Sequence, residues 1–537
     1  MKKETITYIL IFILFLTALF IRAESIGVGL DHPGNLKAGN AFYHTILPTY
    51  LAEGVDVFTF PPNLAEGHDN IINTVSQHQA LLIAPFIKFT GIQDWNLSVL
   101  IVAAISALSV PFMFILAKKI FKSTPVAILS AAFIAVPLYL KDWLYYTYIG
   151  IWLQSSAMTF ILASFLLTYL VYEKLETWKL FALGIVSTAL FLLFPIALLI
   201  TLPLLIAVLI KILKTKKQRI KNTISYIITP LIGIIIAMPV YYLGYFTSKS
   251  YTSTVTSLKE QLATHPFVTD FTGFPIILTI LFALGVLQLL LNYKKYKEII
   301  TFLIFYFALI FLAPHITPTG ITVYIIRMWS TLPYIVFPIA AYGTHFLIIK
   351  NISKMTKIKE VFFIAIVIII LLIFGLSQYT DLKTSLSGEH VSLAKYQALK
   401  WIQENTEKDA TVFMLEGSYQ TEAAYTKRLT YQITIEDLSN KITELGQNNT
   451  LSLNFNSGWF HVASWARYIY RTGYLSHDTH KPLPIPQNIL DFDYVYMEDL
   501  NEVIQQYNAI MIDSLTKEYN YEIVYDKAGY KILKKNE

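Results

Sequence analysis

Cysteine is absent from the 537-residue chain, which excludes disulfide bonds, thiolate metal sites and cysteine nucleophiles. Charged side chains are scarce, at 15% of the residues, whereas 55% of the residues are hydrophobic. The chain also lacks a glycine-rich phosphate-binding loop and an internal repeat. A water-soluble protein does not need so much apolar surface, so the composition indicates an integral membrane protein.

The apolar residues are distributed unevenly along the chain. They dominate residues 1–380, whereas residues 381–537 have the mixed polarity of a globular chain. We therefore expect a transmembrane domain over 1–380, with a first outer loop over 23–95, and a second domain over 381–537. The net charge of +6 comes from lysines in short loops between apolar runs, a pattern typical of membrane orientation rather than of a nucleic-acid partner.

Apolar runs long enough to cross a bilayer predict about eleven transmembrane helices. The first run, 6–22, follows Lys2 and Lys3, and no small-residue cleavage site comes after it. It is therefore interpreted as an anchor rather than as a removed signal peptide. The other spans are expected near 96–117, 123–140, 148–171, 180–194, 196–213, 223–243, 272–292, 299–313, 322–349 and 360–378.

Basic loops set the expected orientation in the cell membrane. The loops at 118–122, 172–179, 211–222, 293–298 and 350–359 all fall on the side of the amino terminus, which the positive-inside rule assigns to the cytoplasm. The alternation requires a tight hairpin within 180–213, turning at Phe194 and Pro195. A single tilted helix there would invert everything downstream. With the hairpin, the carboxy-terminal domain is extracytoplasmic and the chemistry is expected on the outer face.

The tail begins with a helical apolar pattern in SLAKYQALKWIQENTEKDATVFML, residues 392–415, followed by a polar break and a strand-like run. Strand-like apolar alternation returns at 493–497, 508–512 and 521–533, where the last stretch predicts a hairpin around Ala528 and Gly529. These patterns predict an α/β domain.

The whole arrangement resembles a known family. One span precedes a long outer loop, short hairpin-linked spans follow, and the last outer domain opens with a helix containing ALKWIQENTEKDATVF. Over nearly the full chain this resembles the GT-C superfamily of membrane glycosyltransferases, and within it the archaeal oligosaccharyltransferase catalytic subunit. The resemblance implies a polytopic α-helical membrane fold and a polyprenyl-linked sugar donor.

The first outer loop contains NAFYHTILPTYLAEG, residues 40–54, which resembles the family's acidic-x-aromatic-aromatic-His element. The family's aspartate position is Asn40 here, and an amide cannot act as a base or as a strong ligand of a divalent metal. Asp31 is then the candidate base, although it fits an Asx-turn before Pro33 equally well. His44 is a candidate substrate contact or a structural hydrogen-bonding residue.

The family's second acidic motif has no counterpart after Gly150, and the nearest carboxylate is Asp142, among aromatic residues that suit either sugar stacking or an interfacial belt. SLKE, ending at Glu260, has the spacing of the family's mobile-loop motif, or it belongs to a solvated amphipathic helix. The resemblance makes Arg327 the candidate ligand of the lipid phosphate, with snorkelling as the alternative.

Two features limit the resemblance. The family's WWDYG acceptor motif is replaced by MLEGSYQ at 414–420, so selection of an asparagine acceptor is not supported. EGHDN at 66–70 holds residue types that bind metals, yet loop solvation explains them better, and no metal ligands are assigned. The sequence does not decide whether a divalent cation, Mn or Mg, is a cofactor.

The sequence therefore predicts a membrane glycosyltransferase that moves a sugar from a polyprenyl-phosphate or diphosphate carrier to a protein or glycan acceptor on the outer face. The first alternative is a catalytically inactive relative that binds lipid-linked glycan or a partner protein. The second is a transporter, which is disfavoured because the spans hold few charges.

Overall fold

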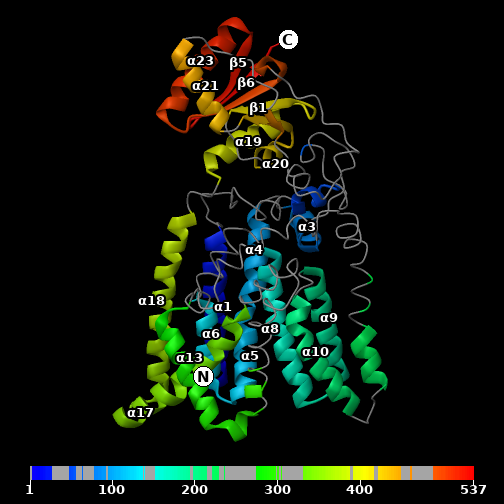
Figure 1. Cartoon of the computed structure of the whole chain (residues 1–537), viewed down its shortest axis with the longest axis vertical. Coiled ribbons are helices and arrows are strands. Elements are labelled where there is room, and N and C mark those ends of the chain that lie inside the picture. Colours follow the sequence, from blue (N-terminus) through cyan, green and yellow to red (C-terminus); the bar gives the residue numbers. More distant parts are fainter. Residues whose placement is uncertain are drawn as a thin grey trace. The chain divides into compact units, whose positions relative to one another are not determined.

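The computed structural model describes a subset of the chain, most of it helical (Figure 1). It divides into two compact units. Unit 1 comprises Met1–Val28, Asn96–Tyr241 and Tyr251–Gly388, and unit 2 comprises Gly29–Trp95, Tyr242–Ser250 and Glu389–Glu537. The described residues are 3–26, 47–55, 63, 78–91, 95–136, 138, 152–193, 197–214, 220–228, 231, 235, 274–297, 299–301, 304, 331–386, 391–415, 421–433, 435–448, 460–462 and 488–536.

Unit 1 is a bundle of apolar helices. Within the described ranges, four helical stretches are long and apolar enough to cross a membrane: Glu4–Ala23, Leu100–Phe121, Pro333–Thr356 and Glu360–Ser377. Large apolar side chains on α1 and α18, such as Phe12 and Ile373, are exposed on the unit's surface. Lipid is the solvent that such faces require. The helices are α1 (Lys3–Ile26), α4 (Trp95–Ala107), α5 (Ser109–Phe121), α6 (Thr124–Ala135), α8 (Trp152–Glu173), α9 (Thr177–Leu193), α10 (Ala197–Lys214), α13 (Ile276–Leu291), α16 (Pro333–Gly343), the π-helix η6 (Thr344–Ile349), α17 (Lys350–Thr356) and α18 (Glu360–Leu386).

Helices α13 and α16 cross at backbone contact. A Cβ atom added to Gly285 would lie 2.0 Å from the carbonyl oxygen of Ile339, and one added to Gly343 would lie 2.6 Å from the backbone nitrogen of Gly285. Two glycines therefore allow an approach that a side chain at either position would block, as small residues do in membrane helix pairs.

α9 ends at Leu193 and α10 begins at Ala197, so two helices stand where the sequence predicts a hairpin within 180–213. The expected turn residues Phe194 and Pro195 lie outside the described residues. Leu180 and Leu183, near the start of α9, share a buried cluster with Val208 and Ile212 near the end of α10. Two helices whose opposite ends pack together in this way run antiparallel.

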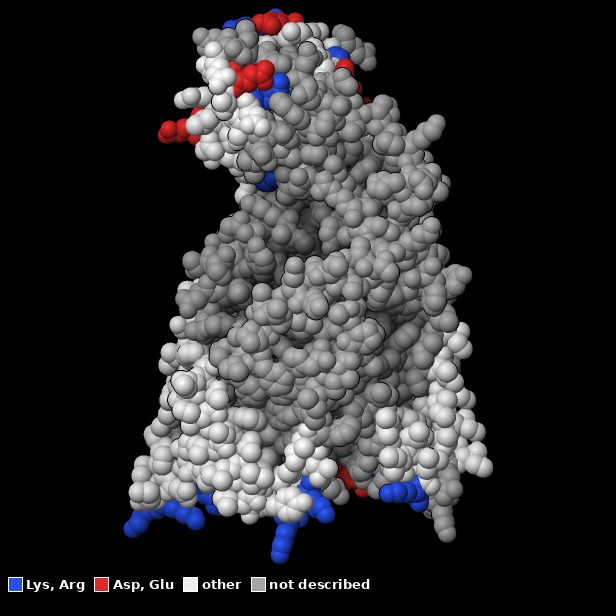
Figure 2. Space-filling view, in the orientation of Figure 1, with Lys and Arg blue, Asp and Glu red and all other residues white. Residues whose placement is uncertain are grey.

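Charged residues gather at one end of the bundle, which Figure 2 shows as a group of lysine and arginine side chains. Here the ends of α5 and α8 meet through Lys119 and Glu173, whose charged atoms are 3.0 Å apart. The start of α9 contacts the segment 220–228, because Thr177 Oγ1 donates to Asn222 Oδ1 at 3.4 Å. The same end holds rings from α5 and α16, Phe121 and Tyr342, with centroids 4.7 Å apart. We call it the basic end.

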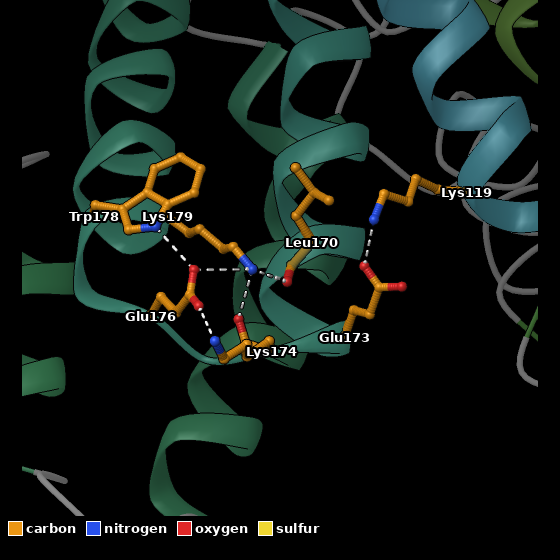
Figure 3. A network of polar contacts seen from close by, with 7 residues as sticks. All are labelled: Lys119, Leu170, Glu173, Lys174, Glu176, Trp178 and Lys179. Atoms are coloured by element: carbon orange, nitrogen blue, oxygen red, sulfur yellow. Dashed lines mark hydrogen bonds and ion pairs between the residues drawn. The ribbon is translucent and has the colours of Figure 1, made fainter. Parts of the chain in front are cut away.

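The turn between α8 and α9 is fixed by a polar network (Figure 3). Lys179 is buried, and its Nζ donates to the carbonyl oxygens of Leu170 and Lys174, which satisfies acceptors at the end of α8. Glu176 accepts from Lys174, Trp178 and Lys179, and the hydrogen bonds from Lys174 and Trp178 lower its pKa to about 2. The network therefore joins the end of α8 to the start of α9.

Unit 2 contains a six-stranded mixed sheet in the order β3-β2-β1-β4-β6-β5. β1 pairs in parallel with β2 and β4, whereas β3, β6 and β5 pair antiparallel with their neighbours. The strands are β1 (Thr411–Leu415), β2 (Leu429–Ile433), β3 (Phe460–Val462), β4 (Tyr494–Glu498), β5 (Tyr521–Lys527) and β6 (Tyr530–Lys535), and the turn between β5 and β6 confirms the hairpin at Ala528 and Gly529.

Helices cover both faces of this sheet. Alternate strand residues enter two clusters, one with α19 (Leu393–Asn405) and α20 (Thr421–Thr426), the other with α21 (Ile435–Asn448) and α23 (Glu502–Glu518). The prediction of a strand at 508–512 is wrong, because these residues lie within α23. The buried positions Ile504, Met511 and Leu515 show the helical spacing that the short alternation obscured. Unit 2 also includes α3 (His78–Thr90) and a short helix over 47–52.

Candidate functional site

The six residues predicted for the site lie outside the described residues: Asp31, Asn40, His44, Asp142, Glu260 and Arg327. Their roles therefore stay predictions. What the structure does describe is the set of helix ends to which their segments connect, and the anchorage of the first outer loop within unit 2.

Three of the predicted residues are close in sequence to described helix ends. Asp31 follows the last residue of α1, Ile26, by five positions. Asp142 follows the last residue of α6, Ala135, by seven positions, and Arg327 precedes the first residue of α16, Pro333, by six. Segments of five to seven residues reach at most about 18–25 Å when fully extended.

These helix ends gather at one end of unit 1, opposite the basic end. The ring of Phe337, near the start of α16, lies 6.1 Å from that of Phe133 in α6 and 6.2 Å from that of Phe274, which precedes α13. Phe20, near the end of α1, lies 6.4 Å from Tyr379 in α18. Within unit 1, the segments that carry Asp142 and Arg327 therefore connect to the same end of the bundle.

A buried arginine connects three helices at this end of unit 1. Arg22 is 4% exposed, and its Nη2 donates to Ser109 Oγ at 3.3 Å and to the carbonyl oxygen of Ile134 at 3.0 Å. It thereby links α1, α5 and α6. The sequence interpretation treated Arg22 as the boundary of the first span. The sequence signal for this role of Arg22 was an ionisable residue at the edge of an apolar run.

In unit 2, residues of the first outer loop contact α20. Asn63 Nδ2 donates to the carbonyl oxygen of Ala423 at 2.7 Å and to the hydroxyl of Tyr50 at 2.8 Å. That hydroxyl donates in turn to the carbonyl oxygen of Ala424 at 3.3 Å. Glu53 forms an ion pair with Lys427.

Beneath α20 lies a buried ionic triad. Lys395 Nζ of α19 is 2.7 Å from Glu422 Oε1 of α20 and 2.5 Å from Glu498 Oε1 of β4. Burial raises the pKa of Glu498, and the neighbouring Lys395 offsets only part of this effect. Tyr496 donates a hydrogen bond to Glu498 at 3.0 Å. The triad is enclosed in the core of unit 2, so it is a structural element rather than a catalytic one.

The described residues contain no group of three or more His, Asp or Glu side chains that could hold a metal ion. The residues of EGHDN at 66–70 lie outside the described ranges, so the structure does not test them as ligands.

Comparisons with known proteins give a likeness of fold. No protein-family model matches the sequence, and no curated protein matches it. Among solved structures, ArnT from Cupriavidus metallidurans in the apo state is 13% identical over 97% of both chains, with a TM-score of 0.53. The same protein bound to undecaprenyl phosphate is 11% identical over 97% of both chains, with a TM-score of 0.50.

The archaeal oligosaccharyltransferase AglB from Archaeoglobus fulgidus, in complex with an inhibitory peptide and a dolichol-phosphate, is 12% identical. The match covers 98% of this chain and 74% of that one, with a TM-score of 0.47. ArnT and AglB are both GT-C glycosyltransferases. The likeness to ArnT shows that the fold of this mostly helical chain is similar to that of a GT-C membrane glycosyltransferase.

Proposed function

We propose that this protein is a membrane glycosyltransferase that moves a sugar or glycan from a polyprenyl-phosphate or diphosphate carrier to an acceptor on the outer face of the membrane. The observation that carries the proposal is the likeness to ArnT along 97% of both chains, in a protein whose solved structures include a complex with undecaprenyl phosphate. The exposed apolar faces of unit 1 supply a surface along which a lipid carrier could lie.

The proposed step is a substitution at the anomeric carbon of the donor sugar. The acceptor oxygen forms the new bond, the bond between the anomeric carbon and the phosphate oxygen breaks, and the lipid phosphate leaves with the electron pair. Asp31 takes the proton of the acceptor hydroxyl as general base. Arg327 binds the leaving phosphate through its planar guanidinium. Within unit 1, the ends of α1 and α6 lie beside the start of α16, to which the segment with Arg327 connects.

The remaining candidates take secondary roles in this proposal. Asn40 and His44 contact the acceptor or the donor from the first outer loop, Asp142 lies among aromatic residues suited to sugar stacking, and Glu260 belongs to the loop before α13. A metal-independent reaction is preferred, because the family's acidic motifs are altered at Asn40 and after Gly150. Transfer that persists in EDTA without added Mn²⁺ or Mg²⁺ is the expected result.

The test is a transfer assay with purified protein in detergent and native polyprenyl-linked sugars, with mass spectrometry of the released lipid phosphate. Wild-type protein is expected to release lipid phosphate. Asp31→Ala should reduce the rate by roughly a hundredfold or more through loss of the general base. Arg327→Ala should reduce it to a similar extent, and Arg327→Lys should recover only part because lysine lacks the planar fork.

A catalytically inactive relative that binds lipid-linked glycan is the second candidate, favoured by Asn40 at the family's aspartate position and by Ile151, Trp152, Leu153 and Gln154 after Gly150. Wild-type protein that binds the carrier without cleaving it would support this candidate. The transporter alternative predicts solute flux in vesicles without a new glycosidic bond.

The proposal includes the topology expected from the sequence. About eleven spans cross the cell membrane, the amino terminus and the basic end of unit 1 face the cytoplasm, and unit 2 lies outside. Five basic loops alternate with outer segments in this arrangement. The tail beyond 381, with its sheet and helices, then forms the extracytoplasmic α/β domain.

A further inference from the structure

The first outer loop and the carboxy-terminal part of the chain are joined by specific contacts within unit 2. Tyr50, Glu53 and Asn63 on the loop contact Ala423, Ala424 and Lys427. We call this set the α20 anchor. Its partners are 360–374 positions apart in the chain.

The α20 anchor satisfies polar groups that a short helix leaves open. The last four carbonyl groups of any α-helix lack partners inside the helix. In α20, which has six residues, two of these acceptors are the carbonyl oxygens of Ala423 and Ala424, and they are the ones that Asn63 and Tyr50 reach. The loop therefore acts as the carboxy-terminal cap of α20.

Charge and burial strengthen the anchor. Lys427 follows the last residue of α20, where a cation interacts favourably with the helix dipole, and it pairs with Glu53. Its Nζ lies 5.3 Å from the ring centroid of Tyr50, within the range of a cation–π contact. Tyr50 is 4% exposed, and burial raises the pKa of its hydroxyl, so this group stays a protonated donor at working pH.

α20, which the loop contacts, is itself connected to the sheet and to α19 by ion pairs and hydrogen bonds. Lys395 ties Glu422 in the first turn of α20 to Glu498 on β4. On the other side, Arg428 donates to carbonyl oxygens at the ends of two helices, Gln403 of α19 at 2.9 Å and Thr426 of α20 at 3.4 Å. Leu47 and Tyr50 also belong to the buried cluster that includes Ala398, Leu399 and Tyr496.

We propose that Tyr50, Glu53 and Asn63 are positioning residues, which hold the first outer loop on α20 so that the adjoining segment with Asn40 and His44 is oriented for transfer. This inference rests on the proposed function. It gives unit 2 an indirect part in the reaction, because the sheet and α20 support the loop that carries the substrate contacts Asn40 and His44. His44 precedes the first described residue of the anchored segment, Leu47, by three positions, so the anchor restrains the chain immediately beside it.

Removal of single donors is the first test. Asn63→Asp keeps the shape of the side chain but replaces the donor by an acceptor facing the carbonyl oxygen of Ala423. Tyr50→Phe removes only the hydroxyl. Because displacing a catalytic group by about 1 Å can cost on the order of a hundredfold in rate, kcat for lipid-phosphate release should fall roughly tenfold to a hundredfold. KM for the lipid carrier should stay within about twofold, because the phosphate contact is assigned to Arg327.

A charge exchange provides the second test. Glu53→Lys and Lys427→Glu each place like charges together and should lower kcat by about fivefold, a size set by a partly exposed ion pair. The double exchange should recover most of the loss. Asp513→Lys is the matched control, because Asp513 pairs with Lys517 on the exposed face of α23 and both side chains are largely exposed. It should leave kcat unchanged.

A covalent restraint separates positioning from a general loss of stability. The chain has no cysteine, so Glu53→Cys with Lys427→Cys creates the only two thiols. Joining them with a short bismaleimide in the Asn63→Asp background should restore kcat at least severalfold, whereas either single cysteine variant treated in the same way should not recover.

Cross-linked protein as slow as the untreated Asn63→Asp variant would overturn the positioning role, as would anchor variants with the kcat of wild type. If wild-type protein itself releases no lipid phosphate, the proposed function fails and the positioning role fails with it. The two failures are therefore distinguished by the activity of the wild type.

Discussion

At the residue scale, the two buried carboxylates Glu422 and Glu498 share Lys395. Burial alone would lower the pKa of Lys395, but the adjacent carboxylates outweigh it and raise the pKa, so the lysine stays charged. Ionised Glu498 is stabilised by Lys395 and by Tyr496, yet its pKa is still raised because desolvation is the largest contribution. A single buried cation, Lys395, therefore offsets the charge of two buried carboxylates.

Replacing Lys395 by methionine should strongly destabilise unit 2. The substitution leaves two carboxylates in a buried site without the cation that both contact. Breaking a buried ion pair by removing one partner typically costs about 3–5 kcal/mol. Thermal unfolding in detergent should show the loss, and adding Glu422→Gln with Glu498→Gln should recover most of it. An unchanged unfolding temperature for Lys395→Met would contradict the role of the triad.

Glu498→Gln should change how stability depends on pH. Because the folded-state pKa of Glu498 is raised above its ordinary value of 4.5, the folded protein binds this proton more tightly than the unfolded chain does. The wild type should lose stability from this group as pH rises above about 4.5 towards the raised pKa, and the variant should not. Lys395, with a pKa raised above 10.5, contributes a constant amount in this range.

Unfolding temperatures of the two proteins at several pH values between 4.5 and 7 measure this difference. The unfolding temperature of the variant relative to that of the wild type should increase as pH rises. Parallel pH profiles for the two proteins would show that Glu498 is not the titrating group.

At the element scale, the crossing of α13 and α16 depends on the absence of side chains. Gly285→Ala would place a methyl group 2.0 Å from the Ile339 carbonyl oxygen, which is backbone and cannot move aside without shifting the helix. Overpacking of this kind costs about 1–3 kcal/mol and more where backbone must move. The unfolding temperature in detergent should fall, and the yield of folded protein should fall with it.

Gly446→Ala is the matched control for that change. Gly446 lies in α21, and an added Cβ would have no atom within 4 Å. Alanine has the higher helix propensity, so this variant should be as stable as wild type or more stable by up to about 1 kcal/mol. Equal losses at Gly285 and Gly446 would argue against a close helix crossing.

The elements also show what local patterns could predict. The apolar stretches that form α1, α4 with α5, α8 and α18 follow from runs of apolar residues, and the hairpin of α9 and α10 follows from the alternation of basic loops. α23 was missed at 508–512 because five residues are too few to separate a period of 2 from one of 3.6.

At the scale of the whole molecule, described parts of four basic loops, 118–122, 172–179, 220–222 and 293–297, lie at one end of unit 1. The ends of α1 and α6 and the starts of α13 and α16 meet at the other end of this unit. The positive-inside rule assigns the basic end to the cytoplasm. The location of the carboxy-terminal domain on the outer face stays a prediction from the sequence.

The cysteine-free chain allows this topology to be measured directly. Met355, beside the basic end, is 84% exposed, and Asp513 is on the exposed face of α23 in unit 2. Each is replaced by cysteine in a separate variant. A membrane-impermeant maleimide applied to intact cells should label the Asp513→Cys protein, and should label the Met355→Cys protein only after permeabilisation. The reverse pattern would invert the proposed orientation and move the chemistry to the cytoplasm.

The site was predictable from the sequence only as a set of candidates. Asp31, Asn40 and Arg327 were named from motif resemblance, and they lie outside the described residues, so their roles stay predictions. Arg22 and the α20 anchor were not predicted. Tyr50 is one of many aromatic residues, and Asn63 is a loop amide, so neither has a local pattern that reveals a partner in α20.

The sequence by itself determined the membrane-embedded region, the spacing of basic loops and the resemblance to a glycosyltransferase superfamily, because hydropathy, charge and motifs are properties of neighbouring residues. Only the tertiary structure decided that Gly285 meets Gly343, that Arg22 joins α1 to α5 and α6, and that the first outer loop caps α20. Such contacts join residues 58–374 positions apart, and their energies depend on burial and geometry that exist only once the chain has folded.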